Sequence, residues 1–469
     1  MSRGSLRWVG AAALAAALAA SRPCAAEEDV PPARFRTGAQ ILGFLGLDFA
    51  LLALSPPPAA DPPGNVRLVE KLTLRAWSFD ASAFPTNFLA HPLAGTLYYT
   101  IARSNRSGPL ESLGWASLAS LTWELAEYPE NVSFNDLMVT PVAGASIGES
   151  LVQLSQWLDR GPPSTGRRVL SAVLFPMKLL NGAPAADEGE AGALAANLRL
   201  ISAFGAHGGP QAGVRVATRL VHFPAFGEPG EGARFGFGGN VSGLSLDARA
   251  GRSGLGDLRF TAGAALATLY QRSLQAERDG WDLLASGGVA YELREHAWDG
   301  GPLDAWSSVH VPGLGIQLRR MDGPFQMTLR ADLALTFVGA RSFALDGGPV
   351  MPVETLTTTQ RAWGYTMGWG LAAAPSLQAA YGPLSLDLGA SVDTRYSLNN
   401  PDPWPDRHPT ASVTDTWSTV RGGLRLKLPW NDLELSASVE RNLRRGTAGA
   451  TTRSAGETVG LFGLGFGLD

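Results

Sequence analysis

Residues 384–396 read LSLDLGASVDTRY, and the character of the side chain changes at almost every step. Leucine, alanine, valine, threonine and tyrosine occupy the even-numbered positions, whereas serine, aspartate, glycine and arginine occupy the odd-numbered ones. A period of two places each set on one face of an extended chain. The stretch therefore predicts a β-strand with one face in an apolar environment.

The same alternation recurs through the C-terminal part of the chain, at residues 258–270, 325–337, 363–371 and 424–440. Several of these runs exceed the ~5–6 residues of a globular strand and suffice for the ~9–11 residues that cross a membrane. The intervening connections alternate between tight turns and long polar loops such as residues 340–354 and 399–409, as in transmembrane barrels. We predict an antiparallel transmembrane β-barrel of roughly twelve strands over residues 197–469; a soluble β-rich domain is the alternative.

Composition agrees with a barrel in lipid. Charged residues make up only 17% of the chain, which contains 56 glycines and 13 tryptophans. Low charge and frequent aromatic residues are typical of proteins with a lipid-facing surface and aromatic girdles. The formal net charge of −4 provides no basic field for nucleic acid. We therefore expect outer-membrane lipid, and not nucleic acid, as a partner.

The N-terminus has the pattern of a secretory signal peptide over residues 1–26. Arg3 and Arg7 precede an apolar run at residues 9–20, and small residues follow at 25 and 26. Cleavage there would remove Cys24, the only cysteine; a lipid anchor on Cys24 is the alternative. Export and a barrel together predict the outer membrane of a Gram-negative-type envelope.

The C-terminal strand offers a second targeting feature. Over residues 457–469, Phe462, Leu464 and Phe466 alternate with glycine. This pattern resembles an outer-membrane assembly signal, although Asp469 replaces the usual terminal aromatic residue. We expect the barrel-assembly machinery to be a partner.

The segment before the barrel has the period of helices instead. An amphipathic segment and a Pro-rich linker (residues 27–65) lead to a helical module at residues 66–182, and a flexible hinge at 183–196 follows. We expect about four helices, at residues 85–102, 110–128, 134–158 and 167–181, with Pro92 kinking the first. Residues 41–54 are apolar but too short to span a bilayer. We expect the module to pack in the barrel lumen or at its periplasmic mouth.

Polar and small residues recur in this module in a fixed order. The motif residues are Trp77, Asp80, Asn87, His91, Gly95, Tyr98, Arg103, Ser120, Glu124, Glu127, Asn135, Asp136, Thr140, Gly144, Gly148 and Glu149. Their run over residues 77–157 resembles the bacterial family known as domain of unknown function 3943. The resemblance implies a signal peptide, a motif-bearing module and an association with outer-membrane barrel segments, and it implies no activity.

His91 is a candidate general base or ligand, with Asn87 one helical turn before it. The competing interpretation is a structural histidine bonded to a carboxylate or carbonyl group. A single histidine without a second one nearby in sequence does not indicate a metal site. We accordingly predict no metal and no cofactor.

Glu124 and Glu127 lie on one face of an otherwise apolar helix, where carboxylates are costly to bury unless paired. They are either an acid/base pair or, together with Asp136 and Glu149, ligands to a hard cation. The competing interpretation is that they form salt bridges with Arg103, Arg106, Arg167 or Arg168. Asn135 and Asp136 also suit the N-terminal cap of the third helix. Gly144 and Gly148, with Thr140, form a line of small residues that lets a neighbouring backbone come close.

Two functions remain open from the sequence. The favoured one is an envelope β-barrel with a structural, binding or transport-related role. The alternative is a membrane-embedded hydrolase or lipid-modifying enzyme that uses Asn87, His91, Glu124, Glu127, Asp136 and Glu149 in one cluster. This alternative requires the His91 ring to lie within reach of Glu124 and Glu149.

Overall fold

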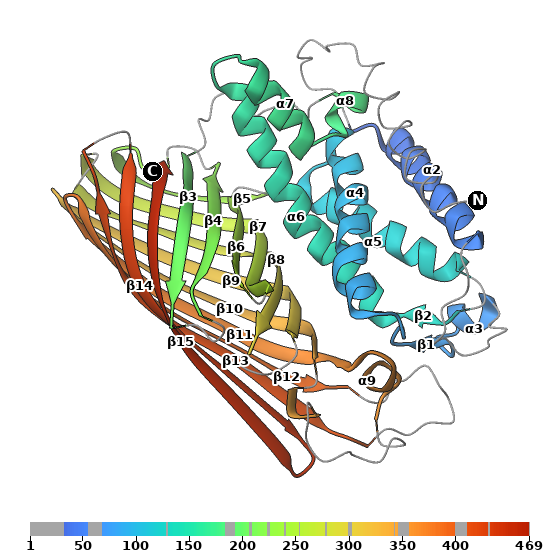
Figure 1. Ribbon diagram of the computed structural model, residues 1–469. Helices are drawn as coiled ribbons and strands as arrows, with labels where there is room; N and C mark the ends of the chain where they lie inside the picture. Colours follow the sequence, from blue (N-terminus) through green and yellow to red (C-terminus); the bar gives the residue numbers. More distant parts are fainter. Residues whose placement is uncertain are drawn as a thin grey trace.

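The computed structural model describes residues 32–54, 68–127, 130–182, 193–205, 209–222, 226–238, 241–252, 254–276, 279–298, 303–341, 343–345, 356–398, 410–429 and 432–468. The predicted signal peptide and the main part of the hinge, residues 183–192, lie outside the described residues. The described residues form a helical module and a β-barrel (Figure 1).

The barrel begins at Ala193, four residues before the predicted boundary. Its strands are β3 (Ala193–Phe204), β4 (Gln211–Val221), β5 (Gly230–Phe237), β6 (Val241–Gly251), β7 (Gly254–Ala276), β8 (Asp279–Ala297), β9 (Leu303–Asp322), β10 (Phe325–Arg341), β11 (Tyr365–Tyr381), β12 (Leu384–Ser397), β13 (Val413–Lys427), β14 (Leu433–Ala448) and β15 (Thr451–Leu468). All pairings in this sheet are antiparallel.

The sheet closes on itself with twelve strand positions. The last strand, β15, pairs with the first, β3, from Gly460↔Phe204 to Leu468↔Ala196. Strands β5 and β6 both pair with β7, at residues 267–274 and 254–264 respectively, so they are two parts of one interrupted strand. The predicted antiparallel barrel of roughly twelve strands is confirmed.

The two faces of the barrel wall can be assigned from contacts that cross the lumen. Arg249 of β6 lies 3.5 Å from Glu440 of β14, and Arg444 of β14 lies 2.8 Å from Asp304 of β9. These strands are not neighbours in the sheet, so the charged side chains must face the lumen. The side chains that alternate with them, such as Val439 and Leu443, are exposed on the outer face.

The outer face changes character along β13, β14 and β15. Next to the tight turns it is apolar, with Leu424, Leu435, Phe462 and Leu464 exposed. Toward the other end the outward positions become polar or charged, as at residues 414, 416, 441, 445 and 454. An apolar stretch of ~11 residues, at ~3.3 Å per residue and a tilt of ~40°, is ~28 Å high, which matches a membrane core.

The described residues of the module form seven α-helices where about four were expected, because two precede the expected helices and the fourth expected helix is divided. They are α2 (Arg34–Ala53), α3 (Leu68–Leu72), α4 (His91–Ser104), α5 (Pro109–Ala126), α6 (Phe134–Arg160), α7 (Thr165–Leu174) and α8 (Lys178–Asn181). A short parallel pair, β1 (Trp77–Ser78) and β2 (Val132–Ser133), joins the segment before α4 to the residues directly before α6 at one end of the module (Figure 1).

The helix that carries Pro92 is continuous from residue 84 to residue 104, and Thr86–Ala90 form a π-helical turn directly before α4. Pro92 is the second residue of α4 and has no backbone N–H to donate into that turn; the kink at this position stays a prediction. The fourth predicted helix is divided into α7 and α8, with residues 175–177 between them.

Glycines bring α4 and α6 together. A Cβ at Gly95 would stand 1.8 Å from the carbonyl oxygen of Thr140, and one at Gly144 would stand 2.3 Å from the carbonyl carbon of Gly95. A Cβ at Gly148 would lie 2.7 Å from the ring of Tyr99. The predicted close approach at this line of small residues is confirmed.

The module packs against the outside of the barrel wall, alongside β6–β11 (Figure 1). Leu244, Tyr291, Val309 and Phe337 belong to one apolar core with residues of the helices, and they occupy the face opposite the lumenal charges. The expectation that the module lies in the lumen is wrong, because the apolar outer face of these strands contacts helices here instead of lipid.

Helix α6 lies at the centre of this arrangement. Ser150 donates hydrogen bonds to the carbonyl oxygens of Gly243 and Gly263 (both 3.2 Å), and Ser242 donates to Gln153 (2.8 Å). By length and composition α6 could cross a membrane, yet 78% of its most apolar window is buried. It is the core helix of the module.

Candidate functional site

Three segments of the module bring Asp80, His91 and Asp136 together. Asp80 follows β1, His91 is the first residue of α4, and Asp136 lies in the first turn of α6. His91 Nε2 is 3.5 Å from Asp136 Oδ1, and one side-chain atom from each residue lies within 4.8 Å of those of the other two. Asp136 is almost fully buried, whereas the His91 side chain keeps 20% of its surface exposed. The group is therefore reachable from one side.

Hydrogen bonds from the backbone fix the position of this group. Asn135 Oδ1 accepts from the Asp80 backbone N–H (2.9 Å), and Asn135 Nδ2 donates to Asp136 Oδ1 (2.8 Å). Asp80 Oδ1 also accepts from the Ser82 N–H (2.9 Å). The cap of α6 is Ser133, whose Oγ accepts from the Asp136 N–H (3.3 Å). The prediction that Asn135 and Asp136 serve as the cap is wrong, and their side chains are free to build the site.

Glu124 and Glu127 of α5 stand beside this group and share its excess of negative charge. Glu124 Oε2 accepts from the Ser133 N–H at 2.6 Å, and Lys71 donates to the carbonyl oxygens of both glutamates. Burial, reinforced by the charge of Asp136, raises the pKa of Glu124 well above its usual range and that of Glu127 to about 7. Of the arginines that we considered as partners, Arg103 binds Glu149 (2.8 Å) and Arg167 donates to the Leu158 carbonyl oxygen (3.0 Å).

Burial acts on the other members as well. It raises the pKa of Asp136, with a further contribution from the charge of Asp80, and it lowers the pKa of His91. Near neutral pH the imidazole is therefore neutral, with a lone pair on one ring nitrogen. A neutral imidazole beside carboxyl groups is the protonation state of a general base or of a metal ligand.

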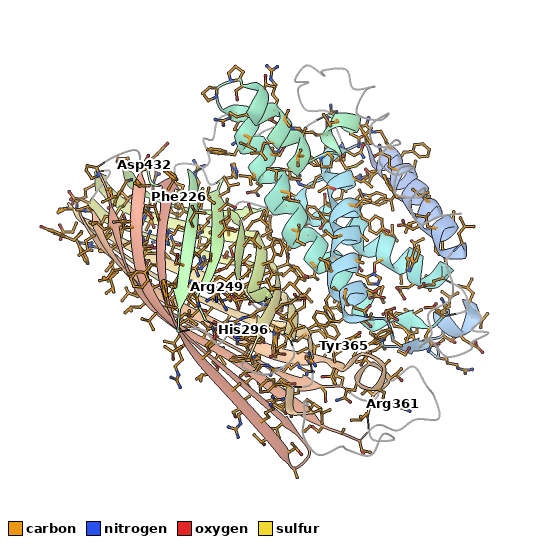
Figure 2. The ribbon with its side chains drawn as sticks, viewed as in Figure 1. Phe226, Arg249, His296, Arg361, Tyr365 and Asp432 are labelled. Atoms are coloured by element: carbon orange, nitrogen blue, oxygen red, sulfur yellow. The ribbon has the colours of Figure 1, made fainter. Side chains whose placement is uncertain are left out.

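Asn87 and Tyr365 close the barrel side of the site. Asn87 Nδ2 donates to the Tyr365 hydroxyl (2.9 Å), which donates to the Ser82 carbonyl oxygen (2.7 Å). Asn87 is fully buried, yet its Oδ1 has no hydrogen-bond partner among the described residues. Figure 2 shows Tyr365 on the part of the barrel wall that faces the helical module, and the charges of Asp80 and Asp136 act on its hydroxyl group.

Glu149 is not part of this cluster. It accepts from Arg103 Nε and from the Tyr99 hydroxyl (both 2.8 Å), and from Gln153 (2.9 Å). This carboxylate is fully paired and joins α4 to α6. The prediction that Glu149 converges with His91 is wrong, and Asp80, which we placed in the structural motif, takes its place.

The remaining motif residues have structural contacts. Trp77 donates to the Lys71 carbonyl oxygen (2.7 Å), Tyr98 to Asp48 (3.4 Å) and Ser120 to the Asp136 carbonyl oxygen (3.0 Å). These bonds tie the segments that carry the site to their neighbours.

Residues 76–177 match the family model described as a domain of unknown function, DUF3943. We refer to these residues as the DUF3943 segment. It contains Asp80, His91, Glu124, Glu127 and Asp136, and it ends before the barrel begins. No curated protein matches the chain.

Solved structures that resemble the chain are barrels. The translocator domain of the autotransporter NalP from Neisseria meningitidis is 13% identical, covers 60% of this chain and 89% of its own, and has a TM-score of 0.22. A loop-deletion mutant of OmpT, an outer membrane protein of Vibrio cholerae, is 7% identical over 60% and 100% of the two chains, with a TM-score of 0.23. The outer membrane channel DcaP of Acinetobacter baumannii is 9% identical over 60% and 99%, with a TM-score of 0.21. These likenesses concern the fold alone, and the low scores carry no functional argument.

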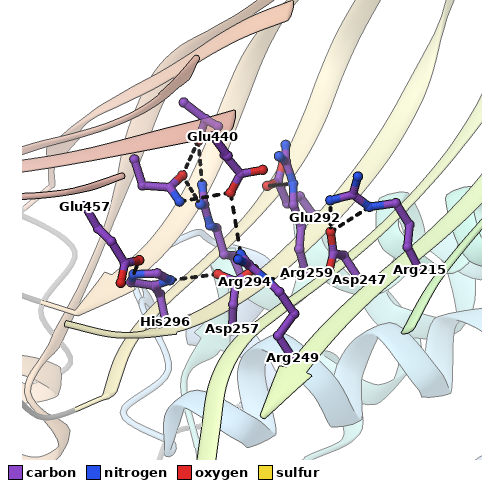
Figure 3. Close-up of polar contacts among 12 residues, drawn as sticks. Arg215, Asp247, Arg249, Asp257, Arg259, Glu292, Arg294, His296, Glu440 and Glu457 are labelled. Atoms are coloured by element: carbon purple, nitrogen blue, oxygen red, sulfur yellow. Dashed lines mark hydrogen bonds and ion pairs between the residues drawn. The ribbon is translucent and has the colours of Figure 1, made fainter. Parts of the chain in front are cut away.

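Outside the DUF3943 segment, the lumen holds a second group of polar residues that the sequence had not singled out (Figure 3). We call it the lumenal network. Its members in Figure 3 are Arg215, Asp247, Arg249, Asp257, Arg259, Glu292, Arg294, His296, Glu440 and Glu457.

Contacts in the lumenal network cross from one wall to the other. His296 lies between Asp257 (2.7 Å) and Glu457 (3.1 Å), and Arg294 donates to Asn442 (2.6 Å). Nearer the long loops, Arg444 binds Asp304 (2.8 Å) and Asp415 (2.6 Å).

Aromatic rings pack around the polar contacts that cross the lumen. The guanidinium of Arg294 lies 4.0 Å from the ring centre of Trp417, and that of Arg444 lies 5.0 Å from Phe343. Trp306, Trp417 and Trp298 form one apolar cluster with Phe343. The lumen is therefore filled at this level by paired charges and rings.

A cavity of about 500 Å³ adjoins the network on the side of the tight turns. Small residues such as Gly263, Gly288 and Ala334 leave the space. Its charged or titratable lining residues are Arg219, Glu292, His310, Arg330 and Asp332. The alternation of charged residues on β7, β8 and β14 contained the signal for this lumen, but a single strand does not reveal which partners lie across it.

Proposed function

We propose that this protein is an outer-membrane β-barrel whose lumen is a closed chamber that binds a small polar solute, and not an open pore. The observation that carries this proposal is the set of ion pairs that join opposite walls of the barrel, namely Arg249–Glu440 in the lumenal network and Arg444–Asp304 nearer the long loops. The cavity lies on the side of the network nearer the tight turns, so a solute would enter from that end. Short turns face the periplasm in such barrels, so the chamber would open toward the periplasm.

The cavity lining supports binding of a charged or zwitterionic solute. Both signs of charge are present, since Arg219, Arg330, Glu292 and Asp332 line the cavity, and Arg330 pairs with Asp332 on the same strand (2.7 Å). Arginine forks recognise carboxylate and phosphate groups, and carboxylates accept from ammonium groups. Export by a signal peptide and insertion by the barrel-assembly machinery are part of this proposal.

Conductance across planar lipid bilayers tests the proposal. The purified full-length protein should leave the bilayer sealed, and Arg249→Ala/Arg444→Ala should produce stable current steps. Arg441→Ala is the matched control, because Arg441 lies on the outer face of the same strand as Arg444. A difference in gel migration between unboiled and boiled samples would establish that each variant is folded.

Stable open-pore currents from the unaltered protein would refute the closed chamber. Recovery of the protein from a periplasmic extract without detergent would refute the location.

A further inference from the structure

We infer that Asp80, His91 and Asp136 form a binding site for a divalent transition-metal ion, with Zn²⁺ as the expected occupant. We call these three residues the Asp-His-Asp site. It is independent of the lumenal chamber, because it lies in the DUF3943 segment on the outside of the barrel wall.

The ligand set fits such an ion. One imidazole nitrogen and two carboxylate oxygens are ligands that Zn²⁺ accepts, and three protein ligands with an open position are the pattern of reactive zinc sites. Tetrahedral ligands at ~2.0–2.1 Å from zinc are ~3.3 Å apart, and His91 Nε2 and Asp136 Oδ1 are 3.5 Å apart. All three ligand atoms lie within 4.8 Å of one another, which rotation of the side chains can shorten.

The carboxyl groups around the site favour a bound cation. Asp80, Glu124, Glu127 and Asp136 lie close enough to act on one another electrostatically, and Lys71 is the cation that contacts this group among the described residues. Lys71 binds carbonyl oxygens, so it neutralises the carboxylates only from a distance. Buried carboxylates without a partner charge are costly, and a divalent ion supplies two positive charges at their centre.

The unpartnered Oδ1 of Asn87 is a second, independent indication of a ligand. A fully buried amide oxygen without a donor destabilises the folded state. Water held in the open position of the ion would provide that donor. Asn87 precedes His91 by four residues, so the two side chains leave the helix on the same side, and the Asn87 amide nitrogen is already held by Tyr365.

The surroundings hold the ligands as metal sites require. Asn135 bonds Asp136 and the backbone of Asp80, and such neighbours orient metal ligands and raise affinity 10–100-fold. The His91 side chain is 20% exposed, which leaves an entry path. An ion here would join the segment after β1 to the first turns of α4 and α6.

Zinc binding by the untagged full-length protein in detergent tests this inference. After chelation and removal of the chelator, one equivalent of Zn²⁺ should bind, and the midpoint of thermal unfolding should rise with Zn²⁺ concentration by mass action. His91→Gln and Asp136→Asn should each weaken Zn²⁺ binding at least ~100-fold. Asp159→Asn is the control, since Asp159 is a carboxylate of the same helix as Asp136 that binds Lys178 (2.8 Å).

Asp80→Asn changes a residue outside the helices and serves as a second variant if the others fail to fold. It should lose Zn²⁺ binding, whereas its migration on a gel without boiling should match that of the unaltered protein. Absence of a stoichiometric Zn²⁺ site in the unaltered protein would overturn the inference. Equal Zn²⁺ affinity in the His91, Asp136 and Asp80 variants would also overturn it, as would binding of Ca²⁺ but not Zn²⁺ or Mn²⁺.

Discussion

Replacing Gly339 with alanine should release the helical module from the barrel wall. Gly339 lies on the outer face of β10, and the ring of Phe88 occupies the space where a side chain would be. A Cβ at Gly339 would stand 2.0 Å from Phe88 Cε2 and 2.1 Å from Cζ. Carbon atoms in contact are ~3.5–4.0 Å apart, so the ring must move by about 1.5 Å or more.

The structure leaves the ring little room for that movement. Phe88 is fully buried, packs edge-on against Tyr365 at 6.1 Å between ring centres, and accepts a hydrogen bond from Tyr291 on its carbonyl oxygen. Overpacking of this kind costs ~1–3 kcal/mol, which corresponds to a shift of ~5–150-fold in the docking equilibrium.

Cross-linking between the module and the wall measures docking. Gln153→Cys and Ser242→Cys, introduced into a chain with Cys24→Ser, place thiols where a 2.8 Å hydrogen bond now joins α6 to β6. A short bis-maleimide should join them in high yield, and Gly339→Ala should lower that yield. The matched control is Gly287→Ala on β8, because a Cβ there would meet Leu314 at an ordinary 3.8 Å.

A double variant separates the proposed clash from general damage to the strand. Phe88→Ala removes the ring, so adding Gly339→Ala to it should cost nothing further, a non-additivity expected only of residues in contact. Unchanged cross-linking in Gly339→Ala, or full additivity of the two substitutions, would refute the docking geometry.

Three further predictions concern the module. Gly95→Ala should lower the free energy of unfolding by ~1–3 kcal/mol, because its Cβ would overlap the Thr140 carbonyl group. Gly114 has open space around it, so Gly114→Ala should leave the midpoint of thermal unfolding unchanged or raise it slightly. Glu149→Gln should lower the free energy of unfolding by ~3–5 kcal/mol, because it removes the negative charge that pairs with the buried guanidinium of Arg103. The double variant Arg103→Met/Glu149→Met should lose less stability than the single variant. An equal or greater loss in the double variant would contradict this pairing. Burial and the charges of Asp136 and Asp80 raise the pKa of Glu127 to about 7, against the attraction of Lys71. The metal-free protein should therefore lose stability as pH rises from about 4.5 to about 7, with on the order of 1–3 kcal/mol from this group. Glu127→Gln should reduce that dependence, and Glu124 and Asp136, whose pKa values are also raised, should account for the rest.

The barrel could be predicted from the sequence because period-two alternation has one physical origin. In residues 384–396 and in β14, each second side chain faces lipid, and the pattern is visible within a single strand. The close approach at Gly95 and Gly144 was also predictable, since a line of small residues has few other uses in a helix.

The position of the module could not be predicted in the same way. Tyr291, Val309 and Phe337 have the same outward apolar pattern whether they meet lipid or a helix, so the sequence gives no sign that α6 covers them. Nor does helical spacing reveal which neighbour a residue faces. Glu149 occupies the expected face of α6, but Arg103 lies opposite it, and Asp80 reaches His91 from a non-helical segment.

Our central claim is that the barrel presents its apolar side chains to lipid and its polar ones to the lumen. Spin labels placed singly along β14, at residues 435–439, test this claim most directly when their accessibility to oxygen and to a water-soluble relaxing agent is measured in liposomes. We predict oxygen accessibility at Leu435, Ala437 and Val439 and low oxygen accessibility at Ser436 and Ser438, with a period of two. Water accessibility at Leu435 and Val439, or no alternation along this strand, would contradict the account.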